Sequence, residues 1–342
     1  MPAEWERHEA TWIGWPHNAS DWPTKFPAIP HVFAEMVKKI STGEKVRILV
    51  ESDVHREQAA KLLTQGGVAL EQIEYFLFPT NRGWTRDLGP IFVKTNDRVA
   101  IARFLFNGWA KYPDWQKDNA VPLQAARALK VPLTEVLFRG QPVVLEGGSI
   151  DVNGAGTLVT TEECLLDSKI QVRNPGFTRE DFEGLFDQFL GTPKVLWLGK
   201  GIAGDDTHGH VDDLCRFVTP RTLVMIRERN ASDENYQALE ENWERVQGFR
   251  LQDGSKPDAV ELPCPAPVYF DGERLPASYA NFYISNAAVI VPTFNDPKDR
   301  LALGILSELI TDRPVVGIHA LDLVEGYGTL HCLTQQQPNE RS

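Results

Sequence analysis

Hydrophobic and polar positions alternate along the chain with two different periods. Short runs rich in Val, Ile and Phe predict strands, namely Lys45–Glu51, Ile73–Pro79, Val99–Phe106, Lys194–Leu198, Thr222–Ile226, Ala287–Pro292 and Pro314–Ile318. Between them, apolar residues recur with helical spacing, in the sets Ile29, Phe33, Met36, Val37, Ile40 and Phe182, Leu185, Phe186, Phe189. Strand pairs that alternate with single helices predict an α/β fold of mixed sheets.

Turn and cap signals divide these elements. Asn153-Gly154, between Ser149–Val152 and Thr157–Thr160, predicts a hairpin. Asp296-Pro297 and Ser232-Asp233-Glu234 are typical of helix starts. Arg250–Pro267 is the one extended loop-like stretch, and no repeat is legible in the sequence. A length of 342 residues fits one large domain as well as two.

Composition indicates a globular protein, because 42% of residues are hydrophobic and 24% are charged. The first eight residues, Met1–His8, lack the basic and apolar regions of a secretory signal. No apolar run reaches membrane-spanning length, so we expect no membrane association. Cysteines are few, far apart and without a CxxC pair, which favours a reducing, cytoplasmic setting. They are Cys164, Cys215, Cys264 and Cys332.

The formal net charge of −12 opposes binding to nucleic acid, which requires a basic surface. It suits a cationic ligand. An acidic surface that serves solubility alone explains the same charge.

Two segments place a carboxylate close to a predicted strand. Gly83–Pro90 follows a strand and contains Asp87, which either faces a site or pairs locally with Arg86. Glu146 follows the apolar run Val143–Leu145 and precedes two glycines. It needs a partner if it is buried, and it begins a solvated turn if it is not.

The segment Gly204–Asp213 holds four carboxylates and two imidazoles within ten residues. In an extended segment His210 and Asp212 share one side, because side chains alternate along a strand. They could then act as a proton donor and a clamp for a cation. A divalent metal bound by His208, His210 and an Asp is one alternative, and a solvated acidic loop is another.

Cys332 follows a glycine-containing turn in Gly326–Pro338, where backbone can approach a ligand closely. The other cysteines are interpreted as small buried apolar residues. A thiolate, a histidine and several carboxylates suit hydrolysis of a guanidine, because carboxylates bind the planar cation and hold its carbon beside sulfur. Peptide hydrolysis would require an oxyanion hole and few carboxylates.

Several motifs, taken in order, resemble those of the agmatine deiminase family within the guanidine-modifying pentein superfamily. They span essentially the whole chain and are Pro2-Ala3-Glu4-Trp5, Thr11–Pro16, Trp84-Thr85-Arg86-Asp87, Glu146-Gly147-Gly148, Arg173-Asn174-Pro175, Asp205–Asp213 and His331–Gln336. The resemblance implies a closed five-bladed α/β propeller of pseudo-fivefold ββαβ units. It also implies a single catalytic domain, residues 1–342.

The resemblance also implies roles for individual residues. Cys332 resembles the nucleophile and His210 the general acid and base. Asp87 and Asp212 resemble the guanidinium clamp, and Glu146 the carboxylate that orients the histidine. Trp84 and Asp206 are expected to line the substrate pocket.

The implied reaction converts agmatine to N-carbamoylputrescine and ammonia through a covalent thiouronium, with no metal or organic cofactor. It leaves homo-oligomerisation open. The chain departs from the family at Tyr327 and Thr329, where glycine and asparagine are usual, and at Cys215, where alanine is usual. Deimination of arginine and a non-catalytic pentein scaffold remain as alternatives.

Overall fold

Five sheets repeat one pattern of strands in the computed structural model, which describes residues 1–95 and 98–340. Each sheet has one strand that pairs antiparallel with one neighbour and parallel with the other, and β3 adds a further parallel strand to the first sheet. Parallel partners need a long crossover, and a helix supplies it each time. The sheets are β20-β1-β2-β3, β4-β5-β6, β9-β10-β11, β12-β13-β14 and β17-β18-β19, beside two hairpins, β7-β8 and β15-β16.

The first two sheets are built from the N-terminal part of the chain and its last strand. The strands are β1 (His8–Gly14), β2 (Lys45–Leu49), β3 (Ile73–Phe76), β20 (Thr334–Pro338), β4 (Ile91–Thr95), β5 (Arg98–Arg103) and β6 (Leu133–Glu135). Their helices are α1 (Ile29–Ile40), α2 (Asp53–Gln65), the short α3 (Thr85–Leu88) and α4 (Val121–Leu129).

The other three sheets follow in chain order. Their strands are β9 (Asp151–Val152), β10 (Thr157–Thr161), β11 (Lys194–Leu198), β12 (Cys215–Phe217), β13 (Thr222–Arg227), β14 (Asp258–Pro263), β17 (Tyr283–Ile284), β18 (Val289–Thr293) and β19 (Val315–His319). The helices are α5 (Glu162–Leu166), α6 (Arg179–Leu190), α7 (Tyr236–Gly248) and α8 (Asp299–Leu309). The hairpins are β7 (Leu137–Phe138) with β8 (Gln141–Pro142), and β15 (Val268–Phe270) with β16 (Glu273–Leu275).

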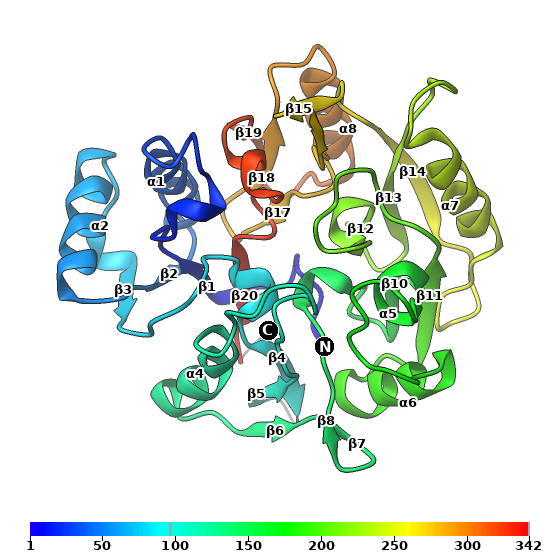
Figure 1. Ribbon diagram of the computed structural model, residues 1–342, viewed down its shortest axis with the longest axis horizontal. Coiled ribbons are helices and arrows are strands. Elements are labelled where there is room, and N and C mark those ends of the chain that lie inside the picture. The colour runs from blue at the N-terminus through cyan, green and yellow to red at the C-terminus, as the bar shows by residue number, and fades with distance from the viewer. Residues whose placement is uncertain (96–97, 341–342) are drawn as a thin grey trace.

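The C-terminal strand completes the sheet that the N-terminus begins. β20 pairs antiparallel with β1, with Ile13 opposite Thr334 and Trp12 opposite Gln335. Figure 1 shows the sheets grouped around a common centre, with helices such as α2, α6 and α7 on the outside and both termini near the centre. The segment that carries Cys332 therefore lies beside the start of the chain.

Apolar side chains of the helices pack against the sheets. In α1 the residues Ile29, Phe33 and Val37 are fully buried, as their helical spacing predicts. Burial of each such side chain contributes about 1.5–3 kcal/mol.

The strand and helix predictions agree with the structure to within a few residues at most ends. The prediction of Arg250–Pro267 as a loop is wrong, because β14 lies within it and pairs parallel with β13. α8 begins at Asp299 and α7 at Tyr236, two or more residues after their predicted start signals. Asp296 instead caps a turn by accepting a hydrogen bond from the Lys298 backbone N–H at 2.7 Å.

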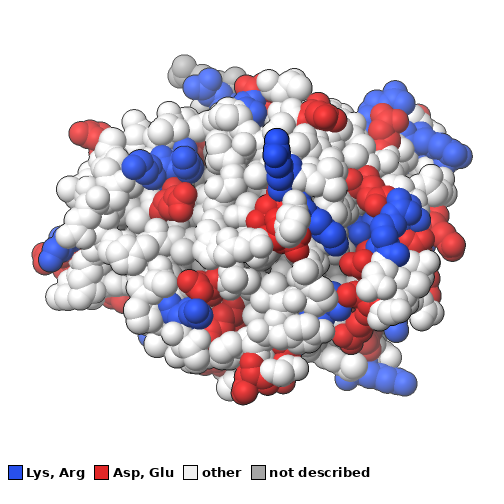
Figure 2. All heavy atoms as spheres, turned by 90° about the horizontal axis from the view of Figure 1, so that it is seen from above, with Lys and Arg blue, Asp and Glu red and all other residues white. Residues whose placement is uncertain are grey.

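No helix in residues 1–95 and 98–340 is long and apolar enough to cross a membrane. On the face shown in Figure 2, acidic and basic side chains lie beside each other.

Candidate active site

A pocket of about 290 Å³ opens next to Cys332. Much of its wall comes from the loop that leads into α3, from the 3-10 turn η6 (Leu323–Gly326) and from the loop between η6 and β20. Its lining residues come from distant parts of the chain and include Asp21, Arg82, Trp84, Asp87, Trp109, Tyr112, Asp206, Glu325, Tyr327 and Cys332. Two predicted pocket residues, Trp84 and Asp206, are among them.

The Cys332 thiol lies buried at this pocket, between the turn after η6 and β20. Asn281 Nδ2 donates a hydrogen bond to its Sγ at 3.1 Å, and the thiol faces Asp212 Oδ2 at 3.7 Å. Burial raises the pKa of this thiol well above its usual value, and Asp212, Asp213 and Asp87 raise it further. These surroundings therefore favour the protonated thiol.

His210 lies between two carboxylates without a close contact to either. Nδ1 is 3.7 Å from Asp87 Oδ1, and Nε2 is 3.7 Å from Glu146 Oε2. Neither ring nitrogen has a hydrogen-bond partner among the described residues. Burial alone would lower its pKa, but Asp87, Cys164 and Glu146 more than offset this and raise the pKa well above its usual value. His210 is thus a cation with protons to donate.

The backbone around His210 does not have the extended form that the sequence analysis considered for this segment. Val211–Asp213 forms a 3-10 turn, η5, directly after His210. His210 and Asp212 nevertheless both reach the same small volume, as the surroundings of Gly148 show. A Cβ atom at Gly148 would lie 2.6 Å from His210 Nδ1, 2.8 Å from Asp87 Oδ1 and 3.1 Å from Asp212 Oδ2.

Asp87, on α3, is buried at the pocket. Trp109 Nε1 donates a hydrogen bond to its Oδ2 at 2.8 Å, and the Gly148 backbone N–H donates to Oδ1 at 3.0 Å. Burial raises the pKa of Asp87 to about 6. Nearby Asp212 adds to this effect, while the His210 cation opposes it.

Glu146 is buried and paired with a cation that the sequence interpretation did not assign. Arg173 Nε donates to its two oxygens at 3.2 and 3.3 Å. Burial would raise the pKa of Glu146, but Arg173 and His210 reverse this and lower the pKa to about 2. The preceding residues make only an isolated bridge, Leu105 to Val144, rather than the strand end that the apolar run suggested.

The metal ligands suggested by the sequence do not come together. His208 Nε2 pairs with Asp167 Oδ2 at 2.8 Å instead of joining His210. Within the described residues, the group with metal-ligand spacing is Glu146, Cys164 and His210, whose ligand atoms lie within 4.8 Å of one another. The positive charge of Arg173 lies beside Glu146, and this charge opposes the binding of a metal cation there. Cys164, interpreted as a packing residue, thus lies beside His210.

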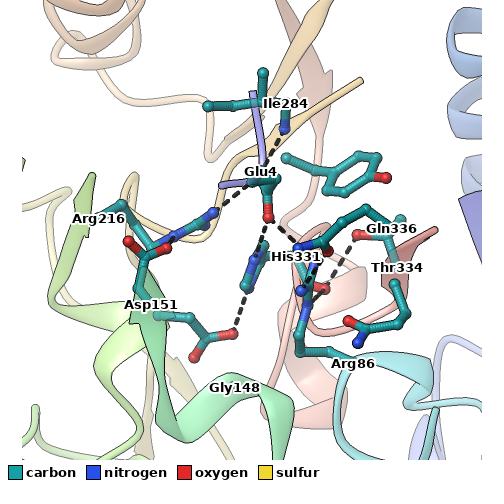
Figure 3. Close-up of polar contacts among 12 residues, drawn as sticks. Glu4, Arg86, Gly148, Asp151, Arg216, Ile284, His331, Thr334 and Gln336 are labelled. Carbon is teal, nitrogen blue, oxygen red and sulfur yellow. Dashed lines mark hydrogen bonds and ion pairs between the residues drawn. The ribbon is translucent and has the colours of Figure 1, made fainter. Parts of the chain in front are cut away.

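Asp212 is held by a second histidine, His331. His331 Nδ1 hydrogen bonds to Asp212 Oδ2 at 2.7 Å, while Asp212 Oδ1 has no partner in the described part of the chain. Burial would raise the pKa of Asp212, but the hydrogen bond and charge of His331 lower it. His331 also contacts Glu4 (Figure 3). In the sequence analysis both residues belonged to motifs but were given no role.

The outer wall of the pocket is acidic and aromatic. Asp206 pairs with Lys111 and accepts a hydrogen bond from the Tyr112 hydroxyl at 2.8 Å. Tyr327 has a φ of 64°, the left-handed region that favours glycine, which is the residue the resembled family has there. Its hydroxyl donates to Glu273 Oε2 at 3.2 Å.

Comparison with known proteins gives consistent results along the whole chain. The family model of Porphyromonas-type peptidyl-arginine deiminase matches residues 1–338. An agmatine deiminase of Medicago truncatula is 35% identical over 99% of this chain and 96% of that protein. The structure of an agmatine deiminase of Enterococcus faecalis has a TM-score of 0.89 at 30% identity, covering 99% of this chain and 96% of that one.

A second solved structure contains a ligand. It is a C. jejuni agmatine deiminase in which a cysteine is replaced by serine, with substrate bound. Its TM-score is 0.87 at 30% identity, with 99% of this chain and 96% of that chain covered.

Proposed function

Since this chain belongs to the Porphyromonas-type peptidyl-arginine deiminase family, we propose that it hydrolyses agmatine to N-carbamoylputrescine and ammonia. The observation that carries the proposal is the convergence of His210, Asp87 and Asp212 on the space beside Gly148, next to the Cys332 thiol. The similar proteins named agmatine deiminase support the choice of substrate.

Substrate binding is the first step. Asp87 and Asp212 accept hydrogen bonds from the guanidinium and hold its carbon beside Cys332 Sγ. The substrate cation also offsets the acidic groups that keep the thiol protonated. A unit charge about 4 Å away contributes about 4 kcal/mol at an effective dielectric constant of about 20, or roughly three pKa units. The thiol then loses its proton to solvent in the pocket.

Two displacements at the guanidinium carbon follow. Sulfur attacks the carbon, and His210 gives a proton to one amino group, which leaves as ammonia when its C–N bond breaks. The product of this step is a cationic thiouronium on Cys332. His210, now neutral, takes a proton from water, whose oxygen attacks the same carbon. The S–C bond breaks, the new hydroxyl gives its proton to the departing sulfur, and the ureido product is released. Arg173 keeps Glu146 ionised, and Glu146 orients His210.

The remaining assignments belong to the same proposal. The five repeated sheets form the closed propeller of the penteins, with Cys332 near its centre, and residues 1–342 act as one catalytic domain. Trp84 and Asp206 contact the aliphatic and distal parts of the substrate. The protein works in the cytoplasm on a small cationic guanidino compound, without a metal, an organic cofactor or nucleic acid.

The charge of the pocket favours agmatine over arginine. Four carboxylates, Asp21, Asp87, Asp206 and Glu325, line it together with one arginine, Arg82. Arg82 is already paired with Asp21 at 3.2 Å and with Asp114 at 2.9 Å. The substrate carboxylate of arginine would therefore enter an acidic pocket without a free cationic partner, which costs several kcal/mol.

Steady-state rates with both compounds test this function. We expect kcat/KM for agmatine to exceed that for arginine by at least ~100-fold, which corresponds to about 3 kcal/mol. Products are identified by mass, because deimination adds oxygen and removes nitrogen from the guanidine. A comparable or higher kcat/KM for arginine would reject agmatine as the substrate. The absence of turnover with any guanidine would favour a binding scaffold.

A further inference from the structure

A chain of buried ionisable side chains connects the N-terminal segment to the nucleophile. Glu4 Oε2 lies 2.8 Å from His331 Nε2, and His331 Nδ1 lies 2.7 Å from Asp212 Oδ2. The same Asp212 oxygen is 3.7 Å from Cys332 Sγ. Figure 3 shows His331 with Glu4 on one side and a second carboxylate on the other. All four side chains are buried.

The hydrogen bonds define the charge of His331. Burial would raise the pKa of Glu4, but Arg216 and His331 hold that pKa well below its usual value. The pKa of Asp212 is also lowered. Ionised carboxylates only accept hydrogen bonds, so both ring nitrogens of His331 donate, which is the hydrogen-bonding pattern of an imidazolium.

Glu4 is fixed much more firmly than a carboxylate near a chain terminus usually is. Its Oε1 pairs with Arg216 at 2.8 Å and accepts a hydrogen bond from the Ile284 backbone N–H at 2.8 Å. Its Oε2 pairs with Arg86 at 3.2 Å as well as with His331. Because Glu4 is held by three other elements, it holds the His331 ring in one orientation.

Asp212 needs a nearby cation in order to remain ionised. It is completely buried, and like charges on neighbouring side chains also oppose its negative charge. The groups that face it are His331, His210, Arg216, the Cys332 thiol, Asp213 and Asp87. Of the cations, His331 makes the short hydrogen bond, and it does so to Oδ2, so that Oδ1 has no partner and is available to a substrate.

We propose that His331 is a positioning residue, anchored by Glu4, that keeps Asp212 ionised and oriented beside Cys332. The N-terminal segment thereby contributes to the reactivity of a cysteine more than 300 residues later in the chain. The part of this inference that concerns turnover rests on the proposed function. The part that concerns Asp212 and the thiol does not.

Replacement of His331 by glutamine tests the charge. H331Q keeps a hydrogen-bonding group but cannot carry the positive charge, so Asp212 takes up a proton. We expect kcat/KM for agmatine to fall at least ~10-fold. The thiol of Cys332 should at the same time react faster with iodoacetamide, because its nearest negative charge is lost. We expect the pH profile of this alkylation to move down by about one pH unit, or about tenfold in rate below the thiol pKa. Mass mapping assigns the alkylated cysteine.

A matched control perturbs the same buried network without contacting His331. Asp151 pairs with Arg216 at 2.6 Å and accepts a hydrogen bond from the Phe217 backbone N–H at 2.8 Å. D151N should lower the melting temperature and leave the alkylation profile and kcat/KM as in the wild type.

The outcomes separate this inference from the proposed function. An unchanged alkylation profile in H331Q, or an equal shift in D151N, rejects the positioning role of His331. If H331Q does not fold, H331N is measured in its place. Failure of both variants to fold shows that His331 has a structural role, and this also rejects the proposed positioning role. A wild-type protein that does not turn over agmatine rejects the proposed function, while the alkylation profiles still decide the role of His331.

Discussion

The two buried histidines of the site, His210 and His331, are held in opposite ways. Both ring nitrogens of His331 make hydrogen bonds to carboxylates, at 2.7 and 2.8 Å. His210 also lies between two carboxylates, but at 3.7 Å from each, and its ring nitrogens have no hydrogen-bond partner among the described residues. The His331 ring is therefore fixed by hydrogen bonds, and the His210 ring is not.

This difference separates positioning from chemistry. A group that passes protons to a substrate and to water must change partners, so strong hydrogen bonds in the empty site would have to be broken first. Buried polar atoms without partners are rare and need an explanation. Several such atoms occur in the described residues, and those of His210 and Asp212 Oδ1 are among them, next to the pocket. Behind Cys332, by contrast, both carboxylate oxygens of Glu4 have partners.

The largest effect is expected from removal of the nucleophile itself. C332A should lower turnover of agmatine by at least ~10⁴-fold, because no other group can form the covalent intermediate. C215A and C264A are the controls and should retain most of the activity. Both of these thiols are buried, have their pKa raised by burial and do not line the pocket. Substantial activity in C332A would exclude the mechanism.

A smaller but still large effect is expected from a methyl group placed in the loosely bonded region. In G148A the new Cβ would approach His210 Nδ1 and Asp87 Oδ1 within 2.8 Å, so these side chains must move. A displacement of about 1 Å costs on the order of 100-fold in rate, and we expect kcat/KM to fall by about this factor while the protein still folds.

The matched control for G148A is a glycine with free space around it. Gly184 lies in α6 with nothing within 4 Å of the position that its Cβ would take. G184A should leave kcat/KM unchanged and stabilise the helix by about 0.5–1 kcal/mol, measured by thermal unfolding. Wild-type rates in G148A would show that the convergence at Gly148 has no role in turnover.

The sequence predicts the elements of this fold better than their assembly. The apolar spacing from Ile29 to Ile40 predicts α1 completely, because one face of this helix is buried. The repetition of five similar sheets leaves no legible trace, since each unit uses different residues. The pairing of β20 with β1 joins the two ends of the chain, and no local pattern encodes it. β14 was missed because its flanking prolines, Asp and Gly suggested a loop.

The site divides in a similar way. Asp87, Glu146, His210, Asp212 and Cys332 belong to motifs, and the structure brings all five together, although their roles stay predictions. Their partners were not predicted: Trp109 and Asn281 lie in stretches with no distinctive pattern. A partner is defined by distance in space, which a single sequence does not contain. For Cys164 the sequence favoured a packing role, and its place beside His210 became visible only in the structure.

The smallest expected effect concerns the hydrogen bond from Trp109 to Asp87. Asp87 must be ionised to bind a guanidinium, and its pKa is raised to about 6, so kcat/KM should fall as the pH drops through about 6. In W109F the donor at 2.8 Å is lost and the carboxylate is less stabilised. The pKa of Asp87 then rises, and the acidic limb of the profile should move up by about half to one pH unit.

The pH profiles of W109F and a control variant test this last step. The loss in W109F should be several-fold near pH 6 and small at pH 8, where Asp87 is ionised in both proteins. His210, Asp212 and Glu146 also face Asp87 and are unchanged. W197F is the control, because it removes a similar bond of 2.9 Å from an indole to Glu183, away from the pocket. An acidic limb that stays in place in W109F, or moves equally in W197F, would contradict the assignment of this limb to Asp87. The proton that limits substrate binding would then belong to another carboxylate of the active site. Asp213 is the next to test, because burial raises its pKa well above its usual value.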